Sequence, residues 1–518
     1  MNNHKSKVWP VTAGIIFAMT VLVTVGFVMK VVGLNMLPTK YLSLAIFGVV
    51  FLLLIILAGF FFVPWPWKKK AEGEETPAPK KNVGKYVART VAMILAVALV
   101  AVDAVGIKMI TEFENTFSEI VEDETEQQIE EFVIGVYVRV DDRAENLEDA
   151  KRYAFGYSLG YDRNNTKKGI DLIEAELDRN LDMEEFSTII PMVDAVLAKE
   201  KDAFILSQAY LDILEAQEGY SDISSKIKCI HEVVVTSETQ TTEKVEDPLV
   251  ITEDAFVVYI SGHDTDYAAK RANSDVNILA VVNPTTKQVL LLNTPRDFYI
   301  PISVSDYKEL DKLTHCGIYG VECSMETLTE FYDVDVNYYA QLNFTGFKRL
   351  IDAIGGISVY CEKDIVSHDG HTFVKGINHL NGEQALSFVR ERKQFGDGDH
   401  ARGRHQMAVI KGIIEKMSSG SLLRNYDDVL NSMGKYFKCN LSQDEITSLV
   451  KMQLNDLAEW NVQSFAVVGT GKNMTSYSLP DLKTYVMIPD DASVEHAKKL
   501  IQMVFDGETI EKEDLEYK

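Results

Sequence analysis

Residues 273–300 read NSDVNILAVVNPTTKQVLLLNTPRDFYI, and this stretch decides the fold of the largest part of the chain. It contains two apolar runs separated by an Asn-Pro-Thr-Thr-Lys segment at 283–287, which is a turn signal. We therefore expect two strands joined by a turn, with the polar group Thr294-Pro295-Arg296-Asp297 at the end of the second strand.

The flanking sequence extends this pattern in both directions. An apolar run, AFVVYISGHD at 255–264, predicts a preceding strand that ends in polar residues. Downstream, we expect a helix from about Met325 to Tyr332, then a strand, a helix, a Gly-Gly turn and a strand over 336–361, and helices over 382–393 and 404–419. Strands that alternate with helices predict an α/β domain, in which helices cover both faces of a central mixed sheet as an α-β-α sandwich.

Three apolar segments precede this domain, at about 8–28, 41–67 and 90–110. Each is long enough to cross a bilayer as a helix, and three such runs do not fit a cleaved signal peptide. Asp103 and Lys108 lie near the outer end of the third segment, where snorkelling or a slightly shorter span would accommodate them.

The charge distribution predicts the orientation of these spans. The formal net charge is -25, yet residues 1–111 carry +8 and the remaining residues carry -33. Seven basic residues between Lys68 and Arg89 place the loop between the second and third spans in the cytoplasm, together with the N-terminus. Everything after about residue 111 would then lie outside the cell, in a multi-pass membrane protein with an extracellular catalytic domain. An acidic external part argues against nucleic acid as a partner.

The chain divides into four parts on these criteria. Residues 1–111 form the membrane region, 112–240 a small external α/β accessory domain, 250–420 the catalytic domain, and 421–518 an extension that completes it. The accessory domain begins with a strand at EFVIGVYVRVDD, and the apolar spacing from Leu147 to Leu214 predicts helices. Five scattered cysteines, without a CxxC pair, argue against a zinc site and against a complete disulfide framework.

Charged residues gather where strands and helices of the predicted catalytic domain end. Asp264 and Asp275 flank the junction of two strands, with Arg271 between them, and Arg296 follows the next strand. Two carboxylates are suitable oxygen ligands for Mg²⁺ or Mn²⁺. Lys312 adds a further cation from the KLTH segment.

The segment 388–406, FVRERKQFGDGDHARGRHQ, is the strongest concentration of positive charge. Arg390 and Arg392 cannot share one helix face, so the helix should end or distort there, and Gly396 and Gly398 then allow the chain to turn back. Several convergent guanidinium groups suit a multiply charged ligand such as a diphosphate, which they bind in bidentate fashion. A segment such as RERK is also common on solvated helix faces, so the pattern alone leaves both readings open.

The motifs taken together resemble the LytR-CpsA-Psr family of cell-wall glycopolymer transferases. They occur in family order over about 255–420: SGHD (261–264), NSDVNIL (273–279), TPRDFY (294–299), KLTHCG (312–317), NFTGFKRLIDAIGGI (343–357), LNGEQALSFVRERK (380–393) and GDGDHARGRHQ (396–406). The three spans and the extra module resemble the capsule-associated CpsA branch.

The resemblance implies a role for each matching position. Asp264 and Asp275 match metal-binding acids. The residues that match holders of the pyrophosphate are Arg271, Arg296, Lys312, Arg390, Arg392, Arg402 and Gln406. Arg296, Asp399 and Arg402 are the implied catalytic residues, with Asp399 orienting the arginines or activating the acceptor. His315 could be structural or catalytic.

The implied function is a metal-dependent phosphotransferase that moves a glycopolymer, capsular polysaccharide in this branch, from a polyprenyl diphosphate to peptidoglycan. Its partners would be the lipid-linked glycan, peptidoglycan, the bilayer and capsule assembly proteins. Two other functions stay open: a non-catalytic, polyprenyl-phosphate-binding regulator of capsule assembly, and a polyprenyl diphosphate pyrophosphatase.

Overall fold

The computed structural model describes residues 5–62, 83–120, 129–160, 163–215, 217, 219–238, 249–263, 273–305, 307–391, 394, 399–421, 429 and 436–517. The chain forms two compact units, described separately below. The membrane unit comprises Met1–Ser118 and Gln443–Leu457, and the main unit comprises Glu119–Ser442 and Ala458–Lys518.

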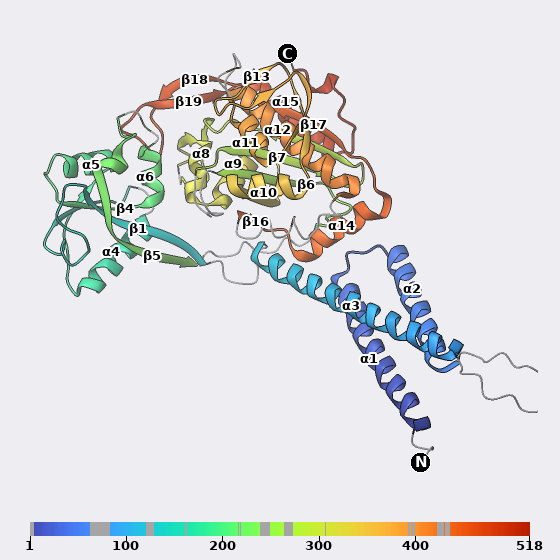
Figure 1. The fold of residues 1–518 in the computed structure, drawn as a ribbon. Coiled ribbons are helices and arrows are strands. Elements are labelled where there is room, and N and C mark those ends of the chain that lie inside the picture. Colours follow the sequence, from blue (N-terminus) through green and yellow to red (C-terminus); the bar gives the residue numbers. More distant parts are fainter. Residues whose placement is uncertain are drawn as a thin grey trace, which may run out of the picture. The chain divides into compact units, whose positions relative to one another are not determined.

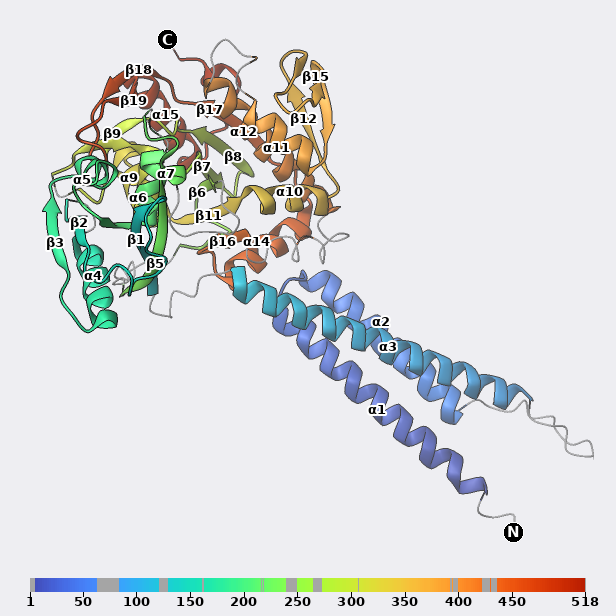
Figure 2. The same ribbon diagram turned by 60° about the vertical axis from the view of Figure 1, so that its left-hand side comes forward.

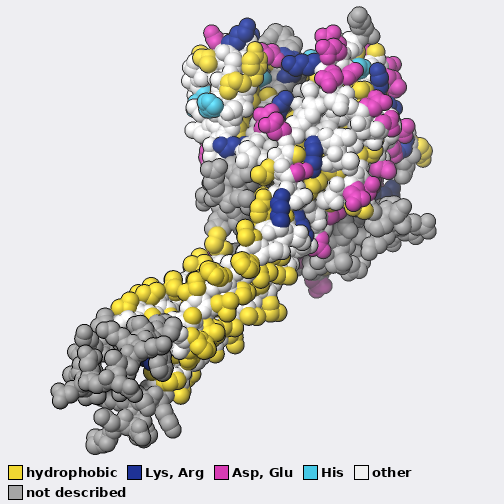
Figure 3. Space-filling model, turned by 90° about the vertical axis from the view of Figure 1, so that its right-hand side faces the viewer, with side chains coloured by type: hydrophobic (Ala, Val, Ile, Leu, Met, Phe, Trp, Pro, Cys, Tyr) yellow, Lys and Arg dark blue, Asp and Glu magenta, His cyan; other side chains and the backbone are white. Residues whose placement is uncertain are grey.

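The membrane unit contains three long apolar helices (Figure 1). They are α1 (Lys5–Leu34), α2 (Thr39–Leu57), which continues as the π-helix η1 (Ala58–Phe62), and α3 (Val83–Ile120). The segments long and apolar enough to cross a membrane are Trp9–Leu34, Thr39–Phe62 and Gly84–Thr116. Hydrophobic side chains cover the helices on the side seen in Figure 3. These properties indicate membrane anchoring, as the sequence predicted; residues 63–67 of the second predicted span lie outside the described residues.

The side chain of Asp103 does not lie where the sequence predicted. Its side chain is buried between helices rather than turned toward an interface, and its Oδ2 accepts a hydrogen bond from Thr24 Oγ1 at 2.5 Å. A carboxyl group among apolar helices is stabilised by such a polar partner, so packing between α1 and α3 replaces the expected snorkelling. Lys108 is exposed and pairs with Glu112 on the same helix. The short helix α14 (Gln443–Asp456) also belongs to this unit, where Lys451 Nζ donates to Asn35 Oδ1 at 2.9 Å.

The first part of the main unit is a five-stranded sheet in the order β3-β2-β4-β1-β5. Its strands are β1 (Ile129–Arg139), β2 (Ala154–Ser158), β3 (Asp182–Phe186), β4 (Ala203–Ser207) and β5 (Ile227–Glu238). Its helices are α4 (Arg163–Leu177), α5 (Ile189–Leu197), α6 (Gln208–Glu215) and α7 (Ile223–Lys226).

The expectation of helices throughout Leu147–Leu214 was wrong for three segments, because β2, β3 and β4 lie within it. The strand β4, AFILS, is buried at all five positions and therefore lacks the alternation that marks a half-exposed strand. A short apolar run of this kind cannot be told from part of a buried helix by periodicity alone.

The larger part of the main unit is built on a six-stranded sheet in the order β16-β11-β6-β7-β8-β17 (Figure 2). The strands are β6 (Phe256–His263), β7 (Val276–Asn283), β8 (Gln288–Asn293), β11 (Tyr338–Asn343), β16 (Phe437–Cys439) and β17 (Asn461–Ala466). The strands β6, β7 and β8 are antiparallel neighbours, whereas β11 runs parallel to β6 and β17 parallel to β8. The sheet is therefore mixed, and the predicted hairpin over 273–300 is confirmed.

Helices cover both faces of this sheet, as expected for an α-β-α fold. On one face lie α8 (Leu313–Cys316), α9 (Val321–Tyr332) and α15 (Asp491–Phe505), and a core joins Leu290 and Leu292 to Leu328 and Leu500. On the other lie α10 (Phe344–Ala353), α11 (Gly382–Arg390) and α12 (Asp399–Lys416), where Met407 packs on Ile278 and Leu291.

The main unit also contains four two-stranded sheets. They are β9 (Tyr299–Pro301) with β10 (Leu310–Lys312), β12 (Ile357–Cys361) with β15 (Gly376–Leu380), β13 (Ile365–Val366) with β14 (Thr372–Phe373), and β18 (Gly469–Met474) with β19 (Thr484–Pro489). The turn between β13 and β14 lies beside the site described next. All five cysteines are free thiols, including the neighbouring pair Cys316 and Cys323.

Candidate active site

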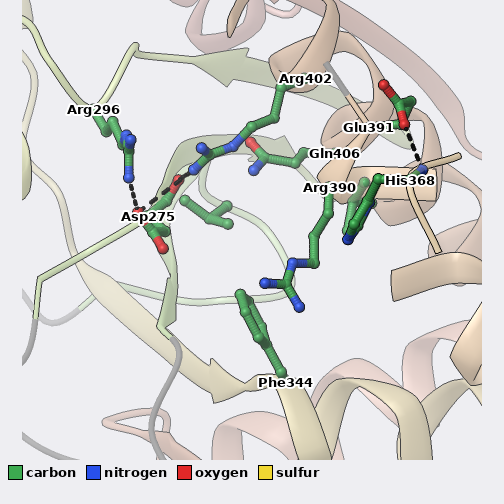
Figure 4. A pocket seen from close by; sticks show the side chains of 10 residues that line it. Asp275, Arg296, Phe344, His368, Arg390, Glu391, Arg402 and Gln406 are labelled. Carbon is green, nitrogen blue, oxygen red and sulfur yellow. Dashed lines mark hydrogen bonds and ion pairs between the residues drawn. The ribbon is translucent and has the colours of Figure 1, made fainter. Parts of the chain in front are cut away.

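A cavity of about 310 Å³ lies where several segments of the main unit meet (Figure 4). Its wall includes five of the predicted site residues, namely Asp275, Arg296, Arg390, Arg402 and Gln406. The remaining wall residues are Val276, Phe344, His368, Val389 and Glu391. The structure thus brings together side chains that are up to 131 positions apart in the sequence, from Asp275 to Gln406.

Neighbouring antiparallel strands of the six-stranded sheet position Asp275 and Arg296 at the cavity. Asp275 immediately precedes β7, and its main-chain N–H donates to the oxygen of Gly262 on β6 at 2.9 Å. Arg296 follows β8, the other neighbour of β7, and its Nη1 donates to Asp275 Oδ1. Two adjacent strand ends therefore form one carboxylate–guanidinium pair at the cavity wall.

Arg402 reaches the same carboxylate from the first turn of α12. Its Nη2 donates to the main-chain oxygen of Asp275 at 2.7 Å and lies 3.6 Å from Oδ1 of the same residue. The next residue, Gly403, faces the end of β8 so closely that an added Cβ would lie 2.3 Å from Nδ2 of Asn293. The absence of a side chain at Gly403 therefore lets α12 approach the sheet without displacing the Asn293 amide, and the approach positions Arg402 and Gln406.

Arg390 enters the cavity from the end of α11. This helix begins at a capping box formed by Asn381 and Gln384, and it ends because Glu391 adopts an extended backbone with φ -74° and ψ 122°. The predicted break after Arg390 is therefore confirmed. The Arg390 guanidinium lies 5.2 Å from the ring centroid of Phe344, within the range of a cation–π contact.

Two buried histidines, His263 and His405, lie close to wall residues but do not line the cavity. Burial lowers the pKa of His263 to about 4, although the nearby charge of Asp275 opposes this shift. Burial also lowers the pKa of His405, whose ring lies 4.3 Å from that of Phe388. Both imidazoles are thus held in the neutral form at neutral pH.

Several predicted residues are not part of this described wall. Lys312 is nearly buried outside it, with Nζ 3.3 Å from Asp297 Oδ1. Asp264, Arg271 and Arg392 lie outside the described residues, and Asp399 begins α12 but its side chain lies outside them too. The roles assigned to these five residues stay predictions.

The described residues alone do not make up a metal site. Within them there is no group of three or more His, Cys, Asp or Glu side chains that could hold an ion. Asp275 supplies one carboxylate, and the contacts of its Oδ1 are with two guanidinium groups. A cation at this position would depend on Asp264 as the second acid.

Sequence reasoning missed His368 and Glu391 as wall residues. Glu391 is buried, and its two oxygens accept the main-chain N–H groups of His368 and Gln394, each at 3.1 Å. The turn signal Ser-His-Asp-Gly at 367–370 could have marked a loop, but nothing local links it to α11.

Comparison with known proteins identifies the family to which this chain belongs. The model of the LytR_cpsA_psr family matches residues 221–492, which is more than half of the chain, and the chain belongs to this family. A relative from Bacillus cereus (strain AH820), "Polyisoprenyl-teichoic acid--peptidoglycan teichoic acid transferase TagU", is 32% identical over 286 residues, covering 55% of this chain and 90% of the relative. A protein of the same name from Enterococcus faecalis (strain ATCC 700802 / V583) is 33% identical over 234 residues, covering 44% and 74% of the two chains.

Solved structures are also similar to this chain. The structure described as "Crystal structure of B. subtilis TagV" is 25% identical with a TM-score of 0.42, covering 50% of this chain and 99% of that one. The structure described as "TagT bound to LI-WTA" is 28% identical with a TM-score of 0.42, covering 51% and 95%.

Proposed function

We propose that this protein is a membrane-anchored phosphotransferase that moves a glycopolymer from a polyprenyl diphosphate to peptidoglycan. The observation that carries the proposal is the convergence of Arg296, Arg390 and Arg402 on one cavity of an otherwise acidic protein. Guanidinium groups in this arrangement match the charge of a diphosphate. The relatives, named as polyisoprenyl-teichoic acid–peptidoglycan transferases, support the same substrate classes.

The reaction is the attack of a peptidoglycan sugar hydroxyl on the phosphorus attached to the glycan. An O–P bond to the acceptor forms, the bond to the polyprenyl phosphate breaks, and polyprenyl phosphate leaves with the electron pair. Arg296, Arg390 and Arg402 would stabilise the negative charge that develops on the leaving phosphate. Phe344, Val276 and Val389 offer an apolar part of the wall to the start of the lipid chain.

A divalent cation, Mg²⁺ or Mn²⁺, is part of the proposal. Asp264 and Asp275 would hold it, and when bound it would supply further stabilisation of phosphate charge. Arg271, Arg392 and Gln406 would bind the phosphates beside it, and Asp399 would orient the arginines, whereas Lys312 pairs with Asp297 outside the cavity wall.

The glycan we propose is capsular polysaccharide, because three spans and an additional module resemble the capsule-associated branch. Capsule assembly proteins would then be partners. Teichoic acid is the second candidate glycan, since it occurs in the names of the relatives. The basic residues between Lys68 and Arg89 support a cytoplasmic N-terminus and an extracellular catalytic domain.

The decisive experiment uses the full-length protein in lipid nanodiscs. It is supplied with a polyprenyl diphosphate-linked disaccharide, Mg²⁺ and soluble peptidoglycan oligomers, and mass spectrometry detects a glycan–phosphate–peptidoglycan adduct. We expect the adduct from the wild-type protein and its loss in Asp275→Ala. Release of the glycan as a phosphate without an adduct would instead identify a pyrophosphatase, and lipid binding with neither product would identify a non-catalytic regulator.

A further inference from the structure

His368 occupies a tightly held turn at the rim of the cavity. It lies between β13 and β14, where the N–H of Gly370 donates to the oxygen of Ser367 at 3.0 Å. Gly370 has φ +91°, a backbone conformation that favours glycine. The side chain of His368 is exposed to solvent and also forms part of the cavity wall.

Two sets of contacts connect this turn to α11, the helix that ends at Arg390. The N–H of His368 donates to Oε2 of Glu391 at 3.1 Å (Figure 4). On the other side, Oδ1 of Asp369 accepts hydrogen bonds from Ser387 at 2.6 Å and Ser367 at 2.5 Å. Burial alone would raise the pKa of Asp369, but these bonds lower it to about 2, so the carboxylate stays ionised. The main chain at His368 is therefore held beside the end of α11 from two directions.

The proposed reaction needs a group that accepts the proton of the attacking hydroxyl. Asp275 is engaged by two guanidinium groups, and the two carboxylate oxygens of buried Glu391 accept main-chain N–H groups. Among the described residues of the wall, His368 is the remaining side chain of a type that serves as a general base. No hydrogen bond within the described part of the chain involves its imidazole ring, so an incoming hydroxyl can reach it.

The rim position also fits the acceptor. Peptidoglycan is a large polymer that approaches from solvent, whereas the lipid-linked donor is held by the arginines inside the cavity. A base for the acceptor should therefore lie at the solvent side of the arginines, as an exposed wall residue does.

We propose that His368 is the general base that activates the acceptor hydroxyl. As the acceptor oxygen forms its bond to phosphorus, the hydroxyl proton passes to a ring nitrogen of His368, and polyprenyl phosphate leaves with the electron pair of the broken P–O bond. The imidazolium then releases the proton to solvent. This inference rests on the transferase function proposed above, and it assigns a role to a residue outside the predicted set.

The test compares His368→Ala with the matched control His371→Ala, which lies on the same turn. In full-length protein in nanodiscs, His368→Ala should lower kcat for adduct formation by about 10²–10⁴-fold. The Kd for a fluorescent polyprenyl diphosphate should stay within about 2-fold of wild type, and added imidazole should restore part of the rate. His371→Ala should behave as wild type.

Three results would overturn the assignment. Wild-type kcat in His368→Ala would exclude a base at this position, particularly if Asp399→Asn abolished transfer instead. A loss of kcat that imidazole does not restore, with an equal loss of donor affinity, would make His368 a binding residue. Finally, a wild-type protein that forms no adduct would refute the transferase function itself, and the His368 assignment with it.

Discussion

Nδ1 of His315 lies 2.7 Å from Oδ1 of Asp311, and both side chains are buried four positions apart. The same oxygen of Asp311 accepts the N–H of Lys312 at 2.7 Å, while Oδ2 accepts the N–H of Ser478 at 2.9 Å and its hydroxyl. This network joins the KLTH segment to the turn that contains Ser478. His315 therefore has a structural contact here and is not part of the cavity wall.

The buried position of Asp311 predicts a large effect on stability. Asp311→Ala would leave the polar groups of His315 and Ser478 without their acceptor and should lower the free energy of unfolding by about 3–5 kcal/mol. Urea denaturation of the full-length protein in detergent, followed by tryptophan fluorescence, would measure this. Asp335→Ala, at an exposed position, should change the midpoint little. Equal midpoints for the two variants would contradict the structural role.

The hydrogen bonds of Asp311 also predict that the stability of the fold depends on pH in the acidic range. Burial would raise its pKa, but the charge and hydrogen bond of His315, with the bonds from Ser478 and Lys312, lower it below 3.8. A lowered folded-state pKa means that ionised Asp311 stabilises the fold above about pH 4 and that this contribution is lost as the pH falls through the folded-state pKa. The difference in midpoint between wild type and Asp311→Asn should therefore shrink below pH 4. A difference that grows in acid would refute this sign.

The position of Arg390 in the cavity wall predicts that its guanidinium group contacts the phosphates of the donor and not its lipid chain. Arg390→Ala should weaken binding of a polyprenyl diphosphate by about 10–150-fold, as expected for the loss of a charge-assisted contact of about 1.5–3 kcal/mol. The matched control is Arg404→Ala on α12, whose guanidinium pairs with Glu362 instead of lining the cavity. Fluorescence binding measurements with the diphosphate and with uncharged polyprenol would check this. An equal loss for both ligands would show that Arg390 does not contact phosphate.

The position of Asp275 in the cavity wall predicts that its carboxylate couples binding of the proposed cation to turnover. Asp275→Ala should lower metal-stimulated turnover by at least about 10²-fold, because it removes one proposed ligand and the partner of Arg296 and Arg402. Turnover is measured against increasing Mg²⁺ and Mn²⁺, with circular dichroism to verify the fold. Normal stimulation by either cation in the variant would remove Asp275 from the site.

The close contact of Gly403 with the sheet predicts that a side chain at this position would move α12 and change the cavity wall. Gly403→Ala would place Cβ against the amide of Asn293 and should destabilise the protein by about 1–3 kcal/mol. Because the displaced helix carries Arg402 and Gln406, donor affinity should fall as well. Glu415→Ala, on the exposed side of the same helix, provides the control for urea midpoint and donor Kd. If Gly403→Ala matched this control in both measurements, α12 would not depend on the close contact.

Local signals in the sequence predicted the central hairpin and the end of α11. The turn at 283–287 and the apolar runs beside it determine the pairing of β7 with β8, and the spacing of Arg390 and Arg392 indicated the helix end. Where burial removes alternation, as in β4, the same signals gave a helix instead of a strand. The charge pattern alone left a binding site and a solvated face open, and it was the resemblance to the LytR-CpsA-Psr family that grouped Asp275, Arg296 and Arg402 in one site.

Long-range contacts explain what the sequence could not predict. The inclusion of His368 in the cavity wall depends on bonds from its turn to Ser387 and Glu391, around 20 positions away. The location of Lys312 outside the described wall depends on Asp297. Neither relationship follows from the periodicity or from the turn signals of the segment concerned.

The order of strands in the main sheet has a consequence for how the protein matures. Both edge strands, β16 and β17, come from residues after 436, whereas the inner strands precede residue 344. The contact of Arg402 with Asp275 also spans 127 residues, and such distant pairings form late during folding. A chain that is still being synthesised therefore has its membrane helices long before it has a finished cavity. Newly made protein can therefore be anchored in the membrane before the side chains of its cavity wall come together.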